Sequence, residues 1–133
     1  MFFKEKNSNE IEKIAALLIH AAKIDENYSD DEEKIIKKTL LEIGANNQNI
    51  ENIILKAKKI EENSNQILEF TKEVKNMDQI NKIKIVKTLW QIIYSNKEAD
   101  IYETSLMRRL AGLLYIDSKT MGDIKDQVKK ESL

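Results

Sequence analysis

The chain has 133 residues, enough for one domain with a hydrophobic core. It contains no cysteine and a single histidine, His20, which excludes disulfides, thiolate nucleophiles, sulfur-ligated metals and a zinc site built from several imidazoles. The net charge of −1 gives no bulk attraction to nucleic acid or anionic lipid, so nucleic acid is not an expected partner.

Composition also indicates the fold class. There are no prolines and three glycines, and 34% of the residues are charged, which favours helices joined by polar turns over a sheet. No apolar run approaches the roughly 20 residues that span a bilayer, and the start, MFFKEKNS, lacks the apolar region of a secretory signal. We therefore expect residues 1–133 to form one all-α helical bundle, located in the cytoplasm and without a transmembrane segment.

Apolar residues at helical spacing predict seven helices. In chain order they cover about 9–24, from after Ser29 to near Gly44, 48–61, 65–76, from after Asp78, 101–115, and from after Ser118. Asp78 is a predicted N-cap and Gly44 a predicted C′ residue. His20 falls opposite the apolar face of the first helix and is predicted to lie at the surface. Trp90 lies beside the core stripe and is predicted to be buried in part.

The helices contain an internal repeat with an offset of 71 residues. Repeat one covers about 9–44 and repeat two about 79–115. The matching apolar pairs include Ile14 and Ile85, Leu18 and Leu89, Ile36 and Met107, and Ile43 and Leu114. The pattern predicts a helix–loop–helix unit that is present twice in a pseudo-twofold bundle.

Each repeat carries oxygen-bearing side chains in and after its loop. In KIDENYSDDE, residues 23–32, they are Asp25, Asn27, Ser29 and Glu32, and in YSNKEADIYE, residues 94–103, they are Asn96, Glu98, Asp100 and Glu103. By helical spacing, four of these residues fall on the apolar faces of the neighbouring helices and are predicted to point inward: Asp25, Glu32, Asn96 and Glu103.

Inward carboxylates need protonation, hydrogen bonds, an ion pair or a metal. Oxygen ligands suit calcium or magnesium, but an EF-hand is excluded, because counting from Asp25 its sixth and twelfth positions hold Asp30 and Ile36 instead of glycine and glutamate. A structural interpretation stays open beside the cation site. Ser29-x-x-Glu32 matches a capping box and Asp100-x-x-Glu103 is a close variant, although capping explains neither Asp25 nor the inward phase.

At these residues the chain resembles the TerB-like family, small helical proteins linked to tellurite resistance and related stress responses. The family pattern, present twice, is an apolar helix, then Ala-Asp-Gly, an aliphatic residue and a glutamate seven after the aspartate. Here it corresponds to Asp25 with Glu32 and to Asn96 with Glu103. The second copy, followed by MRRLAGLL and preceded by Phe70-Thr71, is similar to the uncharacterised TerB-like branch. The resemblance covers nearly the whole chain.

The resemblance implies an all-helical bundle with a divalent-metal or functional site at Asp25, Glu32 and Glu103, and with Asn96 where the family has aspartate. Glu26 and Lys97 replace the family glycines. Because Asn96 carries no charge, the copy around Asp25 is the better cation candidate. Of Arg108 and Arg109, the chain's two arginines, one is expected to pair with the inward acids and the other to be exposed.

The leading hypothesis is a non-enzymatic, stress-related interaction or scaffold module whose acidic half-sites hold the bundle together around a divalent cation, calcium or magnesium. Its expected partner is another protein, and one form of the hypothesis has a membrane-associated partner. One alternative is a metal-dependent enzyme that uses the inward carboxylates as acid and base. Another is a co-chaperone-like, membrane-associated adaptor. The sequence shows no nucleophile, glycine-rich phosphate loop or histidine partner, which favours the non-enzymatic hypothesis. It leaves the oligomeric state open.

Overall fold

The computed structural model describes residues 8–24, 28–63, 67–96 and 101–131. This part of the chain contains seven α-helices, one short 3-10 helix (η1) and no strand. The bounds are α1 Ser8–Ala22, α2 Asp30–Glu42, α3 Ile50–Glu62, α4 Leu68–Lys75, α5 Gln79–Ile93, η1 Tyr94–Asn96, α6 Ile101–Leu113 and α7 Ser118–Glu131. The predicted all-α bundle is confirmed. None of these described helices is both long and apolar enough to cross a bilayer.

Local hydrogen bonds explain where two of the helices begin. At the start of α2 the Ser29 hydroxyl accepts a hydrogen bond from the Glu32 backbone N–H at 3.1 Å. At the start of α5 the Asp78 carboxylate accepts one from the Asn81 N–H at 2.8 Å. Each cap satisfies a backbone donor that has no partner within its own helix. Both predicted helix starts are confirmed.

The helices α2 and α6 end in the same way. After α2, Gly44 has φ +133° and the Ala45 N–H donates to the Leu40 carbonyl at 2.9 Å. After α6, Tyr115 has φ +58° and the Ile116 N–H donates to the Ala111 carbonyl at 3.0 Å. Both patterns are Schellman motifs, with a left-handed residue at C′. Gly44 is thus confirmed as a C′ glycine, whereas α6 uses a tyrosine.

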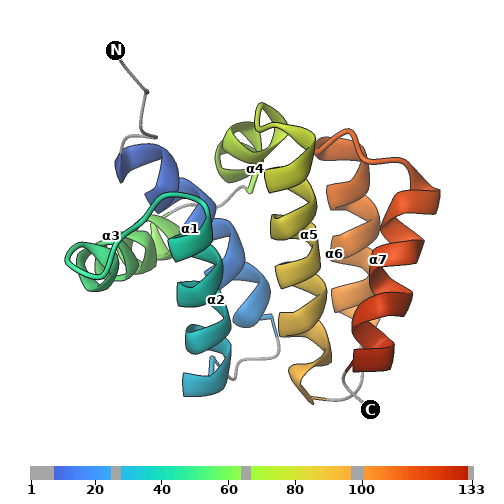
Figure 1. Ribbon diagram of the computed structural model, residues 1–133, viewed down its shortest axis with the longest axis horizontal. Coiled ribbons are helices and arrows are strands. Elements are labelled where there is room, and N and C mark those ends of the chain that lie inside the picture. Colours follow the sequence, from blue (N-terminus) through green and yellow to red (C-terminus); the bar gives the residue numbers. More distant parts are fainter. Residues whose placement is uncertain (1–7, 25–27, 64–66, 97–100, 132–133) are drawn as a thin grey trace.

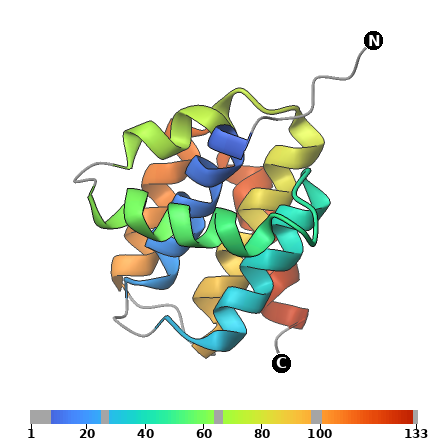
Figure 2. The ribbon, with the colours of Figure 1, turned by 90° about the vertical axis from the view of Figure 1, so that its left-hand side faces the viewer.

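The first helix is the central element of the bundle. In Figures 1 and 2, α3 crosses α1 on one side, while α2, α4 and α5 pack around it. Every residue from Ile14 to Ile19 is fully buried. A helix that is apolar all round belongs inside a protein. The sequence pattern predicted one apolar face, and the buried surface is wider because it includes Ala16, Leu17 and Ile19.

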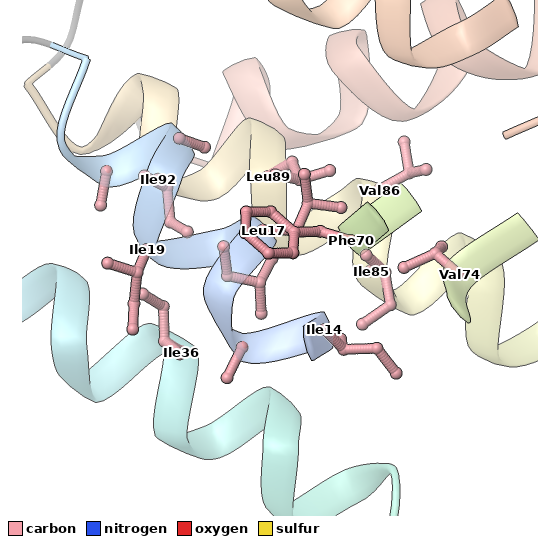
Figure 3. Close-up of a cluster of buried hydrophobic side chains, with 14 of the residues drawn as sticks. Ile14, Leu17, Ile19, Ile36, Phe70, Val74, Ile85, Val86, Leu89 and Ile92 are labelled. Carbon is pink, nitrogen blue, oxygen red and sulfur yellow. The ribbon is translucent and has the colours of Figure 1, made fainter. Parts of the chain in front are cut away.

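The core joins side chains from all seven described helices. Figure 3 shows Ile14, Leu17 and Ile19 of α1 gathered with residues of α2, α4 and α5. Phe70 of α4 is the largest fully buried side chain. On the far side of α5, α7 packs against it. The core therefore fixes the ends of α1, α2 and α5, near which the predicted acidic segments lie.

The two predicted repeats have helices of equal length at one constant offset. Each bound of α5 and α6 lies 71 residues after the corresponding bound of α1 and α2, in the pairs Ser8 and Gln79, Ala22 and Ile93, Asp30 and Ile101, and Glu42 and Leu113. Gly44 and Tyr115, the two C′ residues, have the same offset. The helices thus match in length and in the C′ conformation after α2 and α6, while the internal repeat and its pseudo-twofold arrangement stay predictions.

Candidate functional site

The two acidic segments are attached to helix ends on one side of the bundle. α1 and α5 end, and α2 and α6 begin, at the lower end of the molecule in Figure 1. A pocket of about 470 Å³ joins two of these ends, lined by His20 and Ile24 from the end of α1 and by Ser105, Leu106 and Arg109 from α6. Ile24 directly precedes Asp25, and Ser105 lies two residues after Glu103. The fold thus places neighbours in sequence of both predicted acids around a common pocket.

The structure describes the side chains of only part of the predicted site. Asp25, Asn27, Glu98 and Asp100 lie outside the described residues. The backbones of Asn96 and Glu103 belong to η1 and α6, but their side chains also lie outside the description. Ser29 and Glu32 are described fully, and the geometry of the site is built from them.

Glu32 is a buried carboxylate at the N-terminus of α2, with 1% of its surface exposed. Its Oε1 accepts hydrogen bonds from the Ser29 backbone N–H at 2.9 Å and from the Ser29 hydroxyl at 3.1 Å. These bonds and the positive end of the helix dipole offset the cost of burying the charge. Both the capping box and the inward phase of Glu32 are confirmed.

The oxygens of Glu32 and Ser29 are of the kind that calcium and magnesium prefer. Within the described ranges, no three His, Cys, Asp or Glu side chains come together in a group that could hold a metal ion. A cation would therefore need further oxygens from the predicted ligands whose side chains are not described. The described part of the site, Ser29 and Glu32, offers the oxygen ligands that a hard cation prefers.

A polar cluster beside Glu32 connects the start of α2 to α3. The Tyr28 hydroxyl donates to Glu33 Oε1 at 3.2 Å, and Lys58 of α3 forms an ion pair with the same oxygen at 3.1 Å. Burial and the Glu33 carboxylate raise the pKa of Tyr28 well above its ordinary value. Burial would raise the pKa of Glu33, but hydrogen bonds from Lys58 and Tyr28 outweigh it and lower that pKa. Sequence reasoning missed this cluster because Lys58 is remote in the chain.

A second cluster fixes the end of α1 against α3. Glu61 Oε2 lies 3.2 Å from His20 Nδ1, and Glu61 Oε1 accepts a hydrogen bond from Lys23 Nζ at 2.6 Å. Burial would raise the pKa of Glu61, but the bonds from Lys23 and His20 outweigh it and lower the pKa. The hydrogen bond to Glu61 raises the pKa of Lys23.

His20 is only partly exposed, and the prediction of a surface histidine missed its partner because Glu61 lies 41 residues away in sequence. The two arginines are both exposed. Arg109 lines the pocket at the end of α1, and Arg108 lines a different pocket, between α5, α6 and α7. Among the described residues, His20 and Arg109 are the basic groups on the pocket wall.

Comparison with known proteins identifies the family. A family model described as tellurite resistance protein TerB matches residues 12–126, a stretch that runs from α1 into α7. No curated protein and no solved structure matches the chain. The match covers most of the 133 residues and includes both predicted repeats. The chain therefore belongs to the TerB family of tellurite resistance proteins.

Proposed function

We propose that this chain is a non-enzymatic interaction module of the TerB family, whose two acidic segments bind a divalent cation, calcium or magnesium. The observation that carries the proposal is the pocket lined by Ile24 and Ser105, the neighbours in sequence of Asp25 and Glu103. The cation ligands would be the carboxylates of Asp25, Glu32 and Glu103 and, as an uncharged fourth ligand, the side chain of Asn96. Further oxygen ligands would come from Asn27, Ser29, Glu98 and Asp100.

The geometry of Glu32 supports this proposal. Its carboxylate is buried and held in one orientation by Ser29, so little side-chain entropy remains to be lost when it binds a ligand. A buried carboxylate gains from binding a divalent ion, because the ion offsets the cost of desolvation. Glu32 is the described residue on which the cation site depends most.

A cation held between the two segments would link the α1–α2 pair to the α5–α6 pair. The surface at this end of the bundle would then be better ordered with the ion than without it, and a protein partner that recognises this surface would bind in a cation-dependent way. The stress-related role is proposed from the family alone, because tellurite resistance is part of the family description.

Calorimetric titration with calcium and with magnesium tests the cation site. We expect a saturable signal from the wild type and its loss in the double variant Asp25→Asn, Glu32→Gln. A ligand at 100 times its Kd should also stabilise the folded wild type by about 2.7 kcal/mol. The matched control is Asp30→Asn, Asp31→Asn, which removes the same charge from exposed positions in the first turn of α2.

The control separates a specific site from general attraction between the ion and an acidic surface. Equal titration curves for the two double variants would contradict the cation site, and so would a wild type that gives no signal with either metal. The interaction role is tested separately by retention of a protein partner on the immobilised chain in calcium or magnesium and in EDTA.

A further inference from the structure

A second pocket, of about 240 Å³, lies between α5, α6 and α7, and its described lining side chains come from these helices. Trp90 contributes from α5, Met107 and Arg108 from α6, and Met121 and Lys125 from α7. Of the predicted cation ligands, Ser29 and Glu32 have described side chains, and neither lines it. Its described lining residues also differ from those of the pocket at the end of α1.

Trp90 has an unsatisfied hydrogen-bond donor. It is 3% exposed, its ring stacks on Tyr94 at 6.0 Å between centroids, and the Lys125 ammonium lies 5.4 Å from the ring centroid. The indole N–H is enclosed, and none of the described residues offers it an acceptor. Leaving a buried donor unpaired costs about 1–3 kcal/mol, so an acceptor at this position would have a large effect.

The charges of the pocket wall define the acceptor that fits. The wall carries two cations, Arg108 and Lys125, and among its described lining residues there is no carboxylate. Asp123 and Asp126 are on the same helix as Lys125, but they are exposed and do not line the pocket. The rest of the wall is largely apolar, from Trp90 and the two methionines. Two cations above an apolar floor match a molecule with one anionic group and an apolar body.

Gly122 provides an independent indication that the pocket is kept open. It lies inside α7 and lines the pocket, and a Cβ built there would meet no atom within 4 Å. Neither a positive φ nor crowding requires glycine at this position, and glycine in a helix interior costs about 1 kcal/mol relative to alanine. A larger side chain at 122 would occupy the space beside the pocket.

We propose that the pocket between α5, α6 and α7 binds a small organic carboxylate, with its anionic group held by Arg108 and Lys125 and its apolar body against Trp90. One carboxylate oxygen accepts the hydrogen bond of the indole N–H. Met107, Met121 and Lys125 are flexible side chains, and their movement opens the route to the enclosed nitrogen. At the packing density of protein interiors, about 0.75, the pocket takes a molecule of roughly ten non-hydrogen atoms.

Octanoate has that size and is the probe. Trp90 is the only tryptophan in the chain, so its fluorescence reports this pocket directly. We expect octanoate to change the Trp90 emission saturably, and added salt to weaken binding because the cations are close to the surface. Acetate, which lacks the apolar body, and octylammonium, which has the opposite charge, should bind at least tenfold more weakly.

Variants of the wall test the assigned contacts. Arg108→Gln and Lys125→Gln should each weaken octanoate binding about fivefold or more. Gly122→Leu should abolish it, whereas Gly122→Ala, the small matched control, should retain it. Trp90→Phe keeps an aromatic floor without the N–H and should bind about tenfold more weakly by calorimetry, with circular dichroism confirming that each variant is folded.

The proposal is overturned by a non-saturable octanoate response, by equal binding of octylammonium, or by equal affinity of Gly122→Leu and Gly122→Ala. A folded Trp90→Phe variant with unchanged affinity would overturn the assigned hydrogen bond. Because none of these measurements uses a divalent metal, their outcome is independent of the proposed cation site.

Discussion

Glu61 is the carboxylate through which α3 holds the end of α1. It bonds to both His20 and Lys23, and its side chain is 10% exposed although both partners are near the surface. A carboxylate with two basic neighbours at this position contributes more than an isolated surface ion pair, whose typical contribution is 0–1 kcal/mol. Its contribution should also depend on pH, because the folded state lowers its pKa.

We predict that Glu61→Gln lowers the free energy of unfolding by about 1 kcal/mol at pH 7. Since the folded pKa of Glu61 lies below the ordinary value of 4.5, this stabilisation is present above about pH 4.5 and is lost as the pH falls through the lower, folded value. The stabilities of wild type and variant should therefore converge in acid. Urea unfolding at several pH values measures this.

The control for this prediction is Glu62→Gln, which removes the same charge from an exposed neighbour on α3. It should leave the stability within about 0.5 kcal/mol of wild type. A Glu61→Gln variant that keeps the full pH dependence of the wild type would contradict the role given to this carboxylate.

Tyr115 has an unfavourable backbone conformation at the end of α6. Its φ of +58° lies in the left-handed region, which costs most non-glycine residues about 1–2 kcal/mol, and its side chain is largely exposed. Part of this cost is offset by the Lys75 ammonium, 4.7 Å from the ring centroid. The equivalent position after α2 is Gly44, which has no such steric cost.

We predict that Tyr115→Gly is about 1 kcal/mol more stable than Tyr115→Ala, measured by thermal or urea unfolding. Both variants remove the ring and its contact with Lys75, so the difference between them reports the backbone alone. Equal stabilities would show that the left-handed conformation at this helix end carries no cost.

A buried hydrogen bond joins α2 to α5. The hydroxyls of Thr39 and Thr88 lie 2.5 Å apart, and the Thr88 hydroxyl donates to the Lys84 carbonyl at 2.8 Å. The Thr39 hydroxyl likewise lies 3.3 Å from a carbonyl of its own helix, that of Ile35, so either threonine can donate the bond between the helices. Both side chains are buried, so water does not compete for the bond.

We predict a coupling energy of about 1 kcal/mol between Thr39→Val and Thr88→Val in a double-mutant cycle, because the two single variants remove the same bond. The single changes should each destabilise, and the double variant should lose less than their sum. Strict additivity would contradict a direct bond between these helices.

The stability of the whole molecule depends on α1, because its residues from Ile14 to Ile19 are fully buried and the helix touches α2, α3, α4 and α5. A defect in it disturbs the packing of these four helices. We predict that Leu17→Ala, at a fully buried position, lowers the free energy of unfolding by about 2–5 kcal/mol. Leu55→Ala, at a position 59% exposed on α3, should change it by no more than about 0.5 kcal/mol.

The same experiment tests whether the bundle unfolds as one unit. Trp90 lies on α5, so its fluorescence follows a helix other than α1, while far-ultraviolet circular dichroism follows all helices. We expect the two signals to give one common midpoint in the Leu17→Ala variant. Separate midpoints would show that α5 and its neighbours stay folded after α1 has been lost.

The extent to which the sequence alone could predict the site differs between its parts. Ser29 and Glu32 were predictable because a capping box is a local pattern, decided by residues three apart in the chain. The pairing of His20 with Glu61 and of Glu33 with Lys58 could not be predicted, because the two residues of each pair are far apart in sequence. The two pockets were also missed, since each is formed by side chains of different helices, and the packing of these helices is not a local pattern.

The sequence by itself determined the helical class, the helix bounds at Ser29, Gly44 and Asp78 and the 71-residue spacing, because capping and apolar periodicity act over a few residues. Only the tertiary structure decided that α1 is central, that the helix ends next to both acidic segments lie at one end of the bundle, and that Trp90 has no acceptor among the described residues. The physical reason is that burial and long-range pairing depend on which helices pack together, and this arrangement is a property of the whole chain.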